Sequence, residues 1–178
     1  MTYPKPENES QRLEVLNSLN ILDTAPDDYM DNICRTMKQI YGTRMVLVSL
    51  VAEHRQWFKV HLGLDAEETG RELAFCNYTI MSDEVFEVTN ARENETFACN
   101  PLVTAEPHIR YYCGAPICVA DVNIGSLCLI DTEPRPALSD NMKGALQGFA
   151  KMIAREISNR NMLKEAAGMA AMSLGQAG

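Results

Sequence analysis

Three segments of the chain space their apolar residues at helical intervals. Within each segment, apolar side chains recur every three or four positions and therefore share one face of a helix. The predicted helices begin at residue 9, at residue 27 or 28, and at residue 139 or 140, and Gly42 provides a stop for the second. Their apolar sets are Leu13, Leu16 and Leu19; Met30, Ile33, Met37 and Ile40; and Met142, Leu146, Phe149, Ile153 and Ile157.

Between these helices the pattern becomes that of strands. Residues 45–52 are almost continuously apolar and rich in β-branched side chains, which predicts a strand covered on both faces. A polar turn at 53–55 joins it to a hairpin partner at 56–62. Further strands are predicted at 85–89, 111–119 and 123–130, with a turn at Asp121-Val122 and a short helix at 75–81. This order predicts an α+β fold with a mostly antiparallel sheet.

The chain length suits one domain. A chain of 178 residues can bury one sizeable core. We expect a flexible tail at 1–8, a single domain at 9–165 and a frayed helix end at 166–178.

Two stretches are predicted to be loops. Residues 63–72 form a charged loop, and residues 90–110 show no helical or strand periodicity of apolar residues. A loop as long as 90–110 is uncommon in a compact domain and is usually functional or mobile.

Charge and hydropathy exclude several classes of partner. The net charge is −8, with 24 acidic against 16 basic residues, and this opposes binding to a phosphate backbone. The first ten residues contain no apolar signal core, and no run of about 18 apolar residues would span a bilayer. We therefore expect a cytoplasmic protein, with no nucleic-acid or membrane partner and with its six cysteines as reduced thiols.

Motifs for catalysis or metal binding are not found in the sequence. There is no phosphate-binding loop, no GxSxG elbow and no nucleophile beside an orienting base. The histidines at 54, 61 and 108 are too far apart in sequence to suggest a metal site, and no CxxC pair occurs. These observations predict a protein that is not an enzyme and holds no metal.

An ordered set of short motifs resembles the GAF family of small-molecule-sensing modules. The resemblance runs from about residue 8 to residue 160. Within this family, the chain is similar to the bacterial subgroup found at the N-terminus of sensor histidine kinases and diguanylate cyclases. The motifs are Ile21-Leu22-Asp23-Thr24, Val48-Ser49-Leu50-Val51, Arg55-Gln56-Trp57-Phe58-Lys59, Gly63-Leu64-Asp65, Glu68-Thr69, Arg71-Glu72, Phe75-Cys76, Asn100-Pro101-Leu102-Val103, Pro107-His108-Ile109-Arg110-Tyr111-Tyr112 and Gly125-Ser126-Leu127-Cys128-Leu129-Ile130-Asp131.

The resemblance implies a fold and a role. It implies a six-stranded antiparallel sheet, with the terminal helices on one face and a ligand pocket on the other, under the mid-chain helix and long loop. It also implies a regulatory input module of a two-component or related signalling system, with a kinase or cyclase as output domain and an unidentified small-molecule ligand. The resemblance leaves the cofactor unknown. The length of the last helix, continuing through Leu163 and Ala167, predicts a parallel homodimer through the terminal helices.

Nine residues are candidates for the ligand pocket. Trp57 and Phe58 alternate on a strand, so one of them faces the helices and the other faces the pocket. A cation and aromatic rings at 108–112 would suit an anionic or planar ligand. The alternative for Arg110 is an ion pair with Glu72 or Asp131 that pins the long loop. The candidates are Trp57, Phe75, Cys76, Tyr78, Phe97, His108, Arg110, Tyr112 and Cys113.

Cys76 has two interpretations. It is either a pocket thiol, available for redox sensing or for holding a chromophore, or a small packed core residue. GAF domains that carry bilin attach it through a cysteine that is typically followed by histidine, whereas Asn77 follows here. The Asn-Lys and Asp-Glu signature of cyclic-nucleotide-binding GAF domains is also missing.

Two other functions compete with the sensor. Some free-standing GAF proteins reduce free methionine sulfoxide with pocket cysteines, and Cys76 with Cys113 or Cys118 would have to supply the thiols. Cys113 and Cys118 are separated by an odd number of residues, which places them on opposite faces of one strand. The third interpretation is a dimerisation module whose pocket is collapsed and empty.

Overall fold

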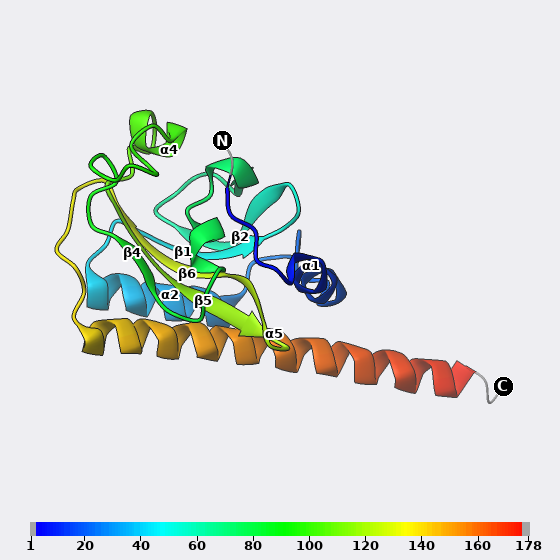
Figure 1. The fold of residues 1–178 in the computed structure, drawn as a ribbon. Coiled ribbons are helices and arrows are strands. Elements are labelled where there is room, and N and C mark those ends of the chain that lie inside the picture. The colour runs from blue at the N-terminus through cyan, green and yellow to red at the C-terminus, as the bar shows by residue number, and fades with distance from the viewer. Residues whose placement is uncertain (1–2, 176–178) are drawn as a thin grey trace.

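The central strand β1, Met45–Val51, organises a six-stranded antiparallel sheet. A computed structural model describes residues 3–175 of the chain. All seven residues of β1 are buried, as the continuous apolar run predicts. The sheet order is β3-β2-β1-β6-β5-β4 (Figure 1), so the predicted α+β fold with six antiparallel strands is confirmed. The other strands are β2 Arg55–Leu62, β3 Glu68–Gly70, β4 Phe86–Val88, β5 Tyr111–Val119 and β6 Val122–Asp131.

A tight hairpin joins β5 to β6. Val119 pairs with Val122, so the loop consists of Ala120 and Asp121, one residue earlier than the predicted turn. Both loop residues have positive φ, 48° and 61°. Two-residue loops of this kind match the right-handed twist of the flanking strands. Together with a β-bulge between Ile117 and Cys118, this loop sets the register that places Gly114 opposite Cys128.

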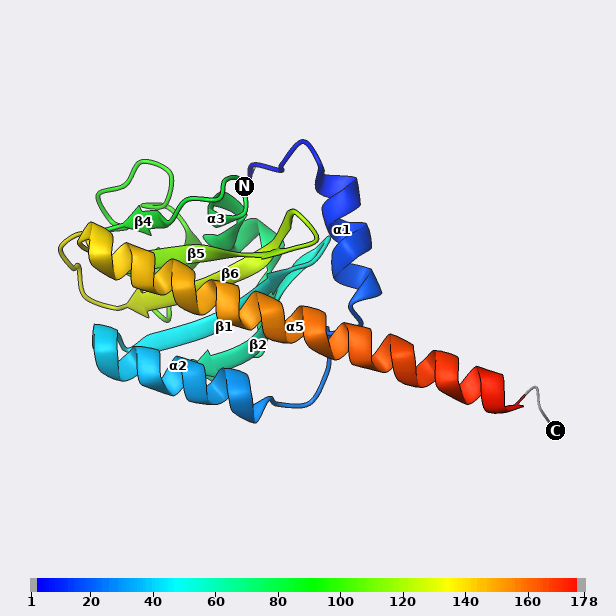
Figure 2. The same cartoon turned by 90° about the horizontal axis from the view of Figure 1, so that it is seen from below.

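Three helices cover one face of the sheet. They are α1 Glu9–Ser18, α2 Asp28–Tyr41 and α5 Asp140–Gly175 (Figures 1 and 2). Asp27 caps α2 by accepting hydrogen bonds from the backbone of Tyr29 and Met30, and Gly42 ends it with a φ of 63°. Every second residue of β1, at 46, 48 and 50, points into the core beneath these helices.

Helix α5 continues past the edge of the sheet (Figure 2). It runs unbroken to Gly175, through residues 166–175 where the sequence predicts a frayed end, and residues 176–178 lie outside the described residues. Every residue from 162 to 172 is exposed. Within residues 3–175, no helix combines the length and the apolar character needed to span a membrane.

Short elements and loops cover the opposite face. Here lie α4 Pro101–Thr104 (Figure 1) and α3 Cys76–Thr79 (Figure 2). The 3₁₀ helix η1 Arg71–Leu73 precedes α3. Strand β3 lies within the predicted loop 63–72 and α4 within the predicted loop 90–110, because elements of three or four residues are too short to display a period. A second apolar core fills the space between this layer and the sheet.

A buried ionic cluster connects α1 to this second layer. The carboxylate of Glu9 accepts hydrogen bonds from Arg12 Nε at 2.9 Å and from Arg71 Nη1 at 2.5 Å. Arg12 also donates to the carbonyl of Val51 at 2.6 Å, and Arg71 donates to that of Ala52 at 3.1 Å. The two guanidinium groups therefore hold the end of β1 between α1 and η1.

The cluster continues into α3. Arg71 Nε donates to Asn77 Oδ1 at 3.0 Å, and Asn77 Nδ2 donates back to the carbonyl of Arg71 at 2.6 Å. The ring of Tyr3, within the predicted tail 1–8, lies 5.2 Å from the Arg71 guanidinium carbon. Arg71 thus joins the N-terminal segment, α1 and α3 at one point.

The pKa of Glu9 records this arrangement. Burial alone would raise the pKa, but hydrogen bonds and charge attraction from Arg12 and Arg71 outweigh it and lower the pKa from 4.5 to about 2. A carboxyl with a depressed pKa in the folded state adds stability above its unfolded pKa and loses it as the pH falls through the folded pKa. The contribution of Glu9 is therefore present above about pH 4.5 and disappears towards pH 2.

We predict that Glu9→Gln lowers the free energy of unfolding at pH 7 by about 3 kcal/mol, because two buried cations lose their anion. The difference between variant and wild type should shrink as the pH falls from about 4.5 to 2. Urea unfolding at several pH values measures both effects. Glu14→Gln, on the exposed side of the same helix, is the matched control. Equal effects of the two substitutions at pH 7 would contradict the role given to the cluster.

Candidate functional site

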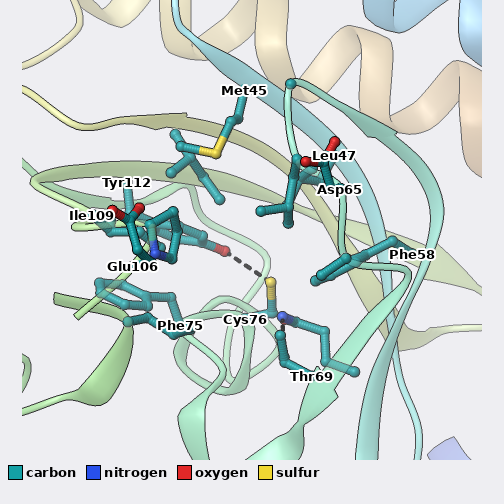
Figure 3. Close-up of a pocket in the computed structure, with 17 residues that line it drawn as sticks. Met45, Leu47, Phe58, Asp65, Thr69, Phe75, Cys76, Glu106, Ile109 and Tyr112 are labelled. Atoms are coloured by element: carbon teal, nitrogen blue, oxygen red, sulfur yellow. Dashed lines mark hydrogen bonds between the residues drawn. The ribbon is translucent and has the colours of Figure 1, made fainter.

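A cavity of about 390 Å³ lies between the sheet and the loop layer. Its floor consists of side chains from β1 and β2, including Met45, Leu47 and Phe58, which point away from the helices (Figure 3). Its mouth lies between two loop segments, 63–66 and 106–107. The other lining residues are Gln56, Thr69, Phe75, Cys76, Leu102, Ile109, Tyr112 and Ile130.

Gln56 belongs to the lining of this mostly apolar cavity and carries an unsatisfied polar atom. Its side chain is buried, with 5% of the residue exposed. Its Nε2 donates to Thr69 Oγ1 at 3.1 Å, which fixes the orientation of the amide. Its Oε1 has no hydrogen-bond partner among the described residues. An unpaired buried acceptor costs about 1–3 kcal/mol.

Two thiols and three hydroxyl groups meet at one wall of the cavity. The Tyr112 hydroxyl donates to Cys76 Sγ at 3.3 Å (Figure 3) and lies 2.7 Å from Thr79 Oγ1. Cys76 Sγ lies 3.4 Å from Cys128 Sγ. Cys128 in turn donates to Ser126 Oγ at 3.2 Å. We call these five residues the thiol–hydroxyl cluster, and all of them are buried.

Gly114 on β5 leaves room for this cluster. A Cβ atom at Gly114 would lie 2.4 Å from the Tyr112 hydroxyl, 2.6 Å from Ser126 Oγ and 2.7 Å from Thr79 Oγ1. These distances are shorter than van der Waals contact, and the neighbours are packed on all sides. Only glycine therefore fits beneath the hydroxyl groups.

The cluster separates the acidities of its members. Burial opposes ionisation of Cys76, but hydrogen bonds including those with Cys128 and Tyr112 outweigh burial, so the pKa of Cys76 lies below its usual value. Burial and the neighbouring thiols raise the pKa values of Tyr112 and Cys128 well above their usual range. Cys76 is therefore the member of the cluster that ionises first.

Aromatic rings stack behind the wall that carries Cys76. Phe75 stacks on Phe97 with 4.0 Å between ring centroids, and Tyr78 meets Phe97 edge-on at 4.9 Å. These contacts anchor α3 to the 90–110 segment and add about 0.5–1.5 kcal/mol per pair beyond area burial. Tyr78 and Phe97 border a shallower hollow beside Tyr3 rather than the cavity.

The nine sequence candidates thus divide by location. Phe75, Cys76 and Tyr112 line the cavity. Trp57 and Cys113 lie in the core on the helical face of the sheet, so Phe58 rather than Trp57 faces the cavity. Burial there, the main cause, raises the pKa of Cys113 to about 12.

The two remaining candidates, His108 and Arg110, lie outside the cavity. Both border a separate surface hollow. Arg110 Nη1 donates to the carbonyl of Val103 at 2.8 Å and to that of Ile109 at 3.0 Å. Its guanidinium therefore pins the long loop through backbone carbonyls, whereas the sequence suggested a carboxylate partner.

Gln56 and Cys128 are two polar residues of the site that sequence reasoning missed. Both follow from strand parity: Gln56 is two residues before Phe58 on one strand, and Cys128 lies opposite Gly114, two residues beyond Tyr112. Strand parity assigns these residues to the cavity only when the face of one reference residue on the strand and the register of the hairpin are already known. The thiol nearest to Cys76 is thus Cys128, and the reductase alternative had considered Cys113 and Cys118.

Comparison with known proteins now places the chain in a family. The family model described as "GAF domain" matches residues 25–157. The chain belongs to the GAF domain family. Two solved structures share the fold of this GAF domain. The GAF domain of a phosphoenolpyruvate-protein phosphotransferase from Acinetobacter has a TM-score of 0.63 and 16% identity, covering 86% of this chain and 94% of that one. A domain of a putative two-component sensor histidine kinase from Sinorhizobium meliloti has a TM-score of 0.62 and 16% identity, covering 83% and 99%.

A curated relative corrects one prediction. A protein of Pseudomonas aeruginosa named cyclic di-GMP phosphodiesterase is 38% identical over 157 residues, which are 88% of this chain and 27% of the relative. The GAF domain therefore has a counterpart within an enzyme, and the prediction that the protein is not an enzyme is wrong. That prediction rested on motifs in a segment that spans 27% of the relative's length, and so it had no bearing on the rest of such a protein.

We predict that Gly114→Ala destabilises the domain by about 2 kcal/mol, because the methyl group displaces the hydroxyl groups of the cluster. Thermal or urea unfolding measures the change. Gly148→Ala is the matched control: Gly148 lies in α5 with nothing within 4 Å of the added Cβ, so alanine should stabilise by about 0.5–1 kcal/mol. A Gly114→Ala variant as stable as wild type would refute the packing described for the cluster.

Proposed function

We propose that this GAF domain is a sensor that binds a small molecule in the cavity and regulates an attached or associated signalling activity. The 390 Å³ apolar cavity, with Gln56 and its unpartnered Oε1 in the lining, carries this proposal. Ligand sites are typically 300–1,000 Å³, mostly apolar, with a few polar groups that orient the ligand. An empty, collapsed module would not be expected to retain both the volume and the unpaired acceptor.

The lining indicates the chemistry of the ligand. Leu47, Phe58, Phe75 and Ile109 offer aliphatic and aromatic contact to a compact apolar body. Gln56 Oε1 would accept a hydrogen bond from a donor on that body. Carboxylates at the mouth, Asp65 and Glu106, disfavour an anion. The proposed ligand is therefore a small, neutral or cationic molecule with at least one donor group.

The ionic cluster offers a route from the cavity to the helices. Cys76 and Asn77 are adjacent on α3, and Asn77 is held by Arg71, which is held by Glu9 of α1. A ligand that shifts α3 would act on α1 through groups that are already in contact. Because the relative is named a cyclic di-GMP phosphodiesterase, we propose an activity of cyclic di-GMP turnover as the regulated output.

The second element of the proposal is a homodimer through α5. Large apolar side chains are exposed along the free part of this helix: Met162 58%, Leu163 70%, Met169 67% and Met172 69%. At 100° per residue, Met162 and Met169 lie within about 20° of one another on the helix surface. Leu163 and Met172 lie about 100° and 80° to either side of Met162, so Met162 and Met169 mark the centre of the seam. A second copy of the same helix would cover this centre, and paired helices could pass a change to an output domain. A cytoplasmic location remains our prediction.

We predict that native mass spectrometry of gently purified protein shows a mass excess that disappears on denaturation. Gln56→Leu keeps the volume of the side chain but removes the acceptor. The fraction of protein molecules that carry the excess mass should therefore fall at least about tenfold, as expected for a lost buried hydrogen bond. Gln147→Leu, on α5 and outside the cavity, should retain the excess. A wild-type protein with the mass of the bare chain in both states would contradict the sensor proposal.

We predict that the double variant Met162→Glu, Met169→Glu is monomeric in light scattering, whereas the wild type is dimeric, because four buried carboxylates would face each other in the seam. Lys164→Glu changes the charge on the opposite side of the helix and should remain dimeric. A monomeric wild type at micromolar concentration would exclude the dimer, with no consequence for ligand binding.

A further inference from the structure

The two thiols of the thiol–hydroxyl cluster come from two different elements, the short helix α3 and the strand β6. Cys76 is the first residue of α3, and Cys128 lies in the middle of β6. Their sulfur atoms are 3.4 Å apart, and both cysteines are free. A disulfide has an S–S distance of about 2.0 Å, so the sulfurs need to approach by about 1.4 Å. A movement of this size is within the reach of a four-residue helix on a cavity wall.

We propose that Cys76 and Cys128 form a reversible disulfide when the domain meets a peroxide, so that the cavity wall is a redox-sensitive site. The proposal stands independently of the small-molecule ligand, because it requires only the two thiols and access through the cavity. Nothing in the family match or the relatives' names assigns such a site to this chain.

The geometry gives the two thiols different roles. Cys76 lines the cavity, whereas Cys128 is 0% exposed and lies behind it. A peroxide entering through the mouth therefore reaches Cys76 first. The Tyr112 hydroxyl donates to Cys76 Sγ at 3.3 Å, and a donor at this position stabilises a thiolate. The lowered pKa of Cys76 and the raised pKa of Cys128 agree with this order.

The chemistry balances in two steps. The Cys76 thiolate attacks one oxygen of hydrogen peroxide, the O–O bond breaks, and the departing hydroxide takes a proton to become water, leaving a sulfenic acid on Cys76. Cys128 then loses its proton and attacks the sulfenic sulfur, the S–O bond breaks, and a second water leaves. The two thiols are oxidised to one disulfide, and one peroxide is reduced to two waters.

The disulfide would change the cavity wall and the chain of contacts that connects α3 to α1. Tyr112 would lose a thiolate or thiol acceptor, and α3 would become covalently fixed to the sheet. Asn77, next to Cys76, carries the contact to Arg71 and hence to α1. Oxidation therefore acts on the same elements through which we propose that a ligand acts.

The test uses the full chain with Cys99→Ser and Cys118→Ser, because these two exposed cysteines would otherwise form disulfides between molecules. After a few equivalents of hydrogen peroxide, intact mass should fall by two hydrogen atoms, and a non-reducing digest should link the peptides of Cys76 and Cys128. Dithiothreitol should restore the original mass. The oxidised form should melt higher by on the order of 5–10 °C, since the bond closes a long loop.

Cys128→Ser in the same background removes the resolving thiol. The sulfenic acid should then persist on Cys76 and be trapped by dimedone, while the buried thiols Cys34 and Cys113 remain unmodified. Peroxide that adds only oxygen to Cys76 of the parent protein, or that leaves Cys76 unmodified in folded protein, would overturn the proposal. The parent digest decides the matter even if the serine variant fails to fold.

Discussion

The carboxylate of Glu9 and the two buried guanidinium groups around it join α1, the end of β1, η1 and α3 at one point. Arg12 and Arg71 are almost completely buried, and a buried cation is stable only when it is paired and hydrogen-bonded. Their shared anion comes from α1, and Nη1 of each arginine also donates to a carbonyl group at the end of β1. The helical layer, the central strand and the layer over the cavity are thereby fixed relative to one another.

The ionic cluster also affects how the walls of the cavity can move. The wall formed by α3 is short, and three features hold it: Asn77 on Arg71, the aromatic stack behind Phe75, and the thiol–hydroxyl cluster. The floor, by contrast, belongs to the rigid strands β1 and β2. A bound molecule or an oxidised thiol would therefore displace α3 rather than the sheet, and a displaced α3 acts first on Arg71. Coupling of this kind requires contacts that differ between two states of the domain. The ionic cluster of Glu9, Arg12 and Arg71 can supply such contacts.

The sequence predicted the large elements and the family because long periodic segments carry strong signals. The apolar run of β1, the helix start at residue 27 or 28, the stop at Gly42 and the period of α5 all correspond to observed features. The site was less accessible for a physical reason. Which face of a strand looks into a cavity depends on hairpin register, so Trp57 and Cys113 were included with the candidates while Gln56 and Cys128 were not. The partners of Arg110 are backbone carbonyls, which no side-chain motif reveals.

The most direct test of the central claim is a crystal structure of protein purified without denaturation or refolding. The account predicts electron density for an organic molecule in the cavity, with a donor atom about 3 Å from Gln56 Oε1. Density for water alone around this oxygen, or a cavity closed by inward movement of α3 and the 63–66 segment, would contradict it.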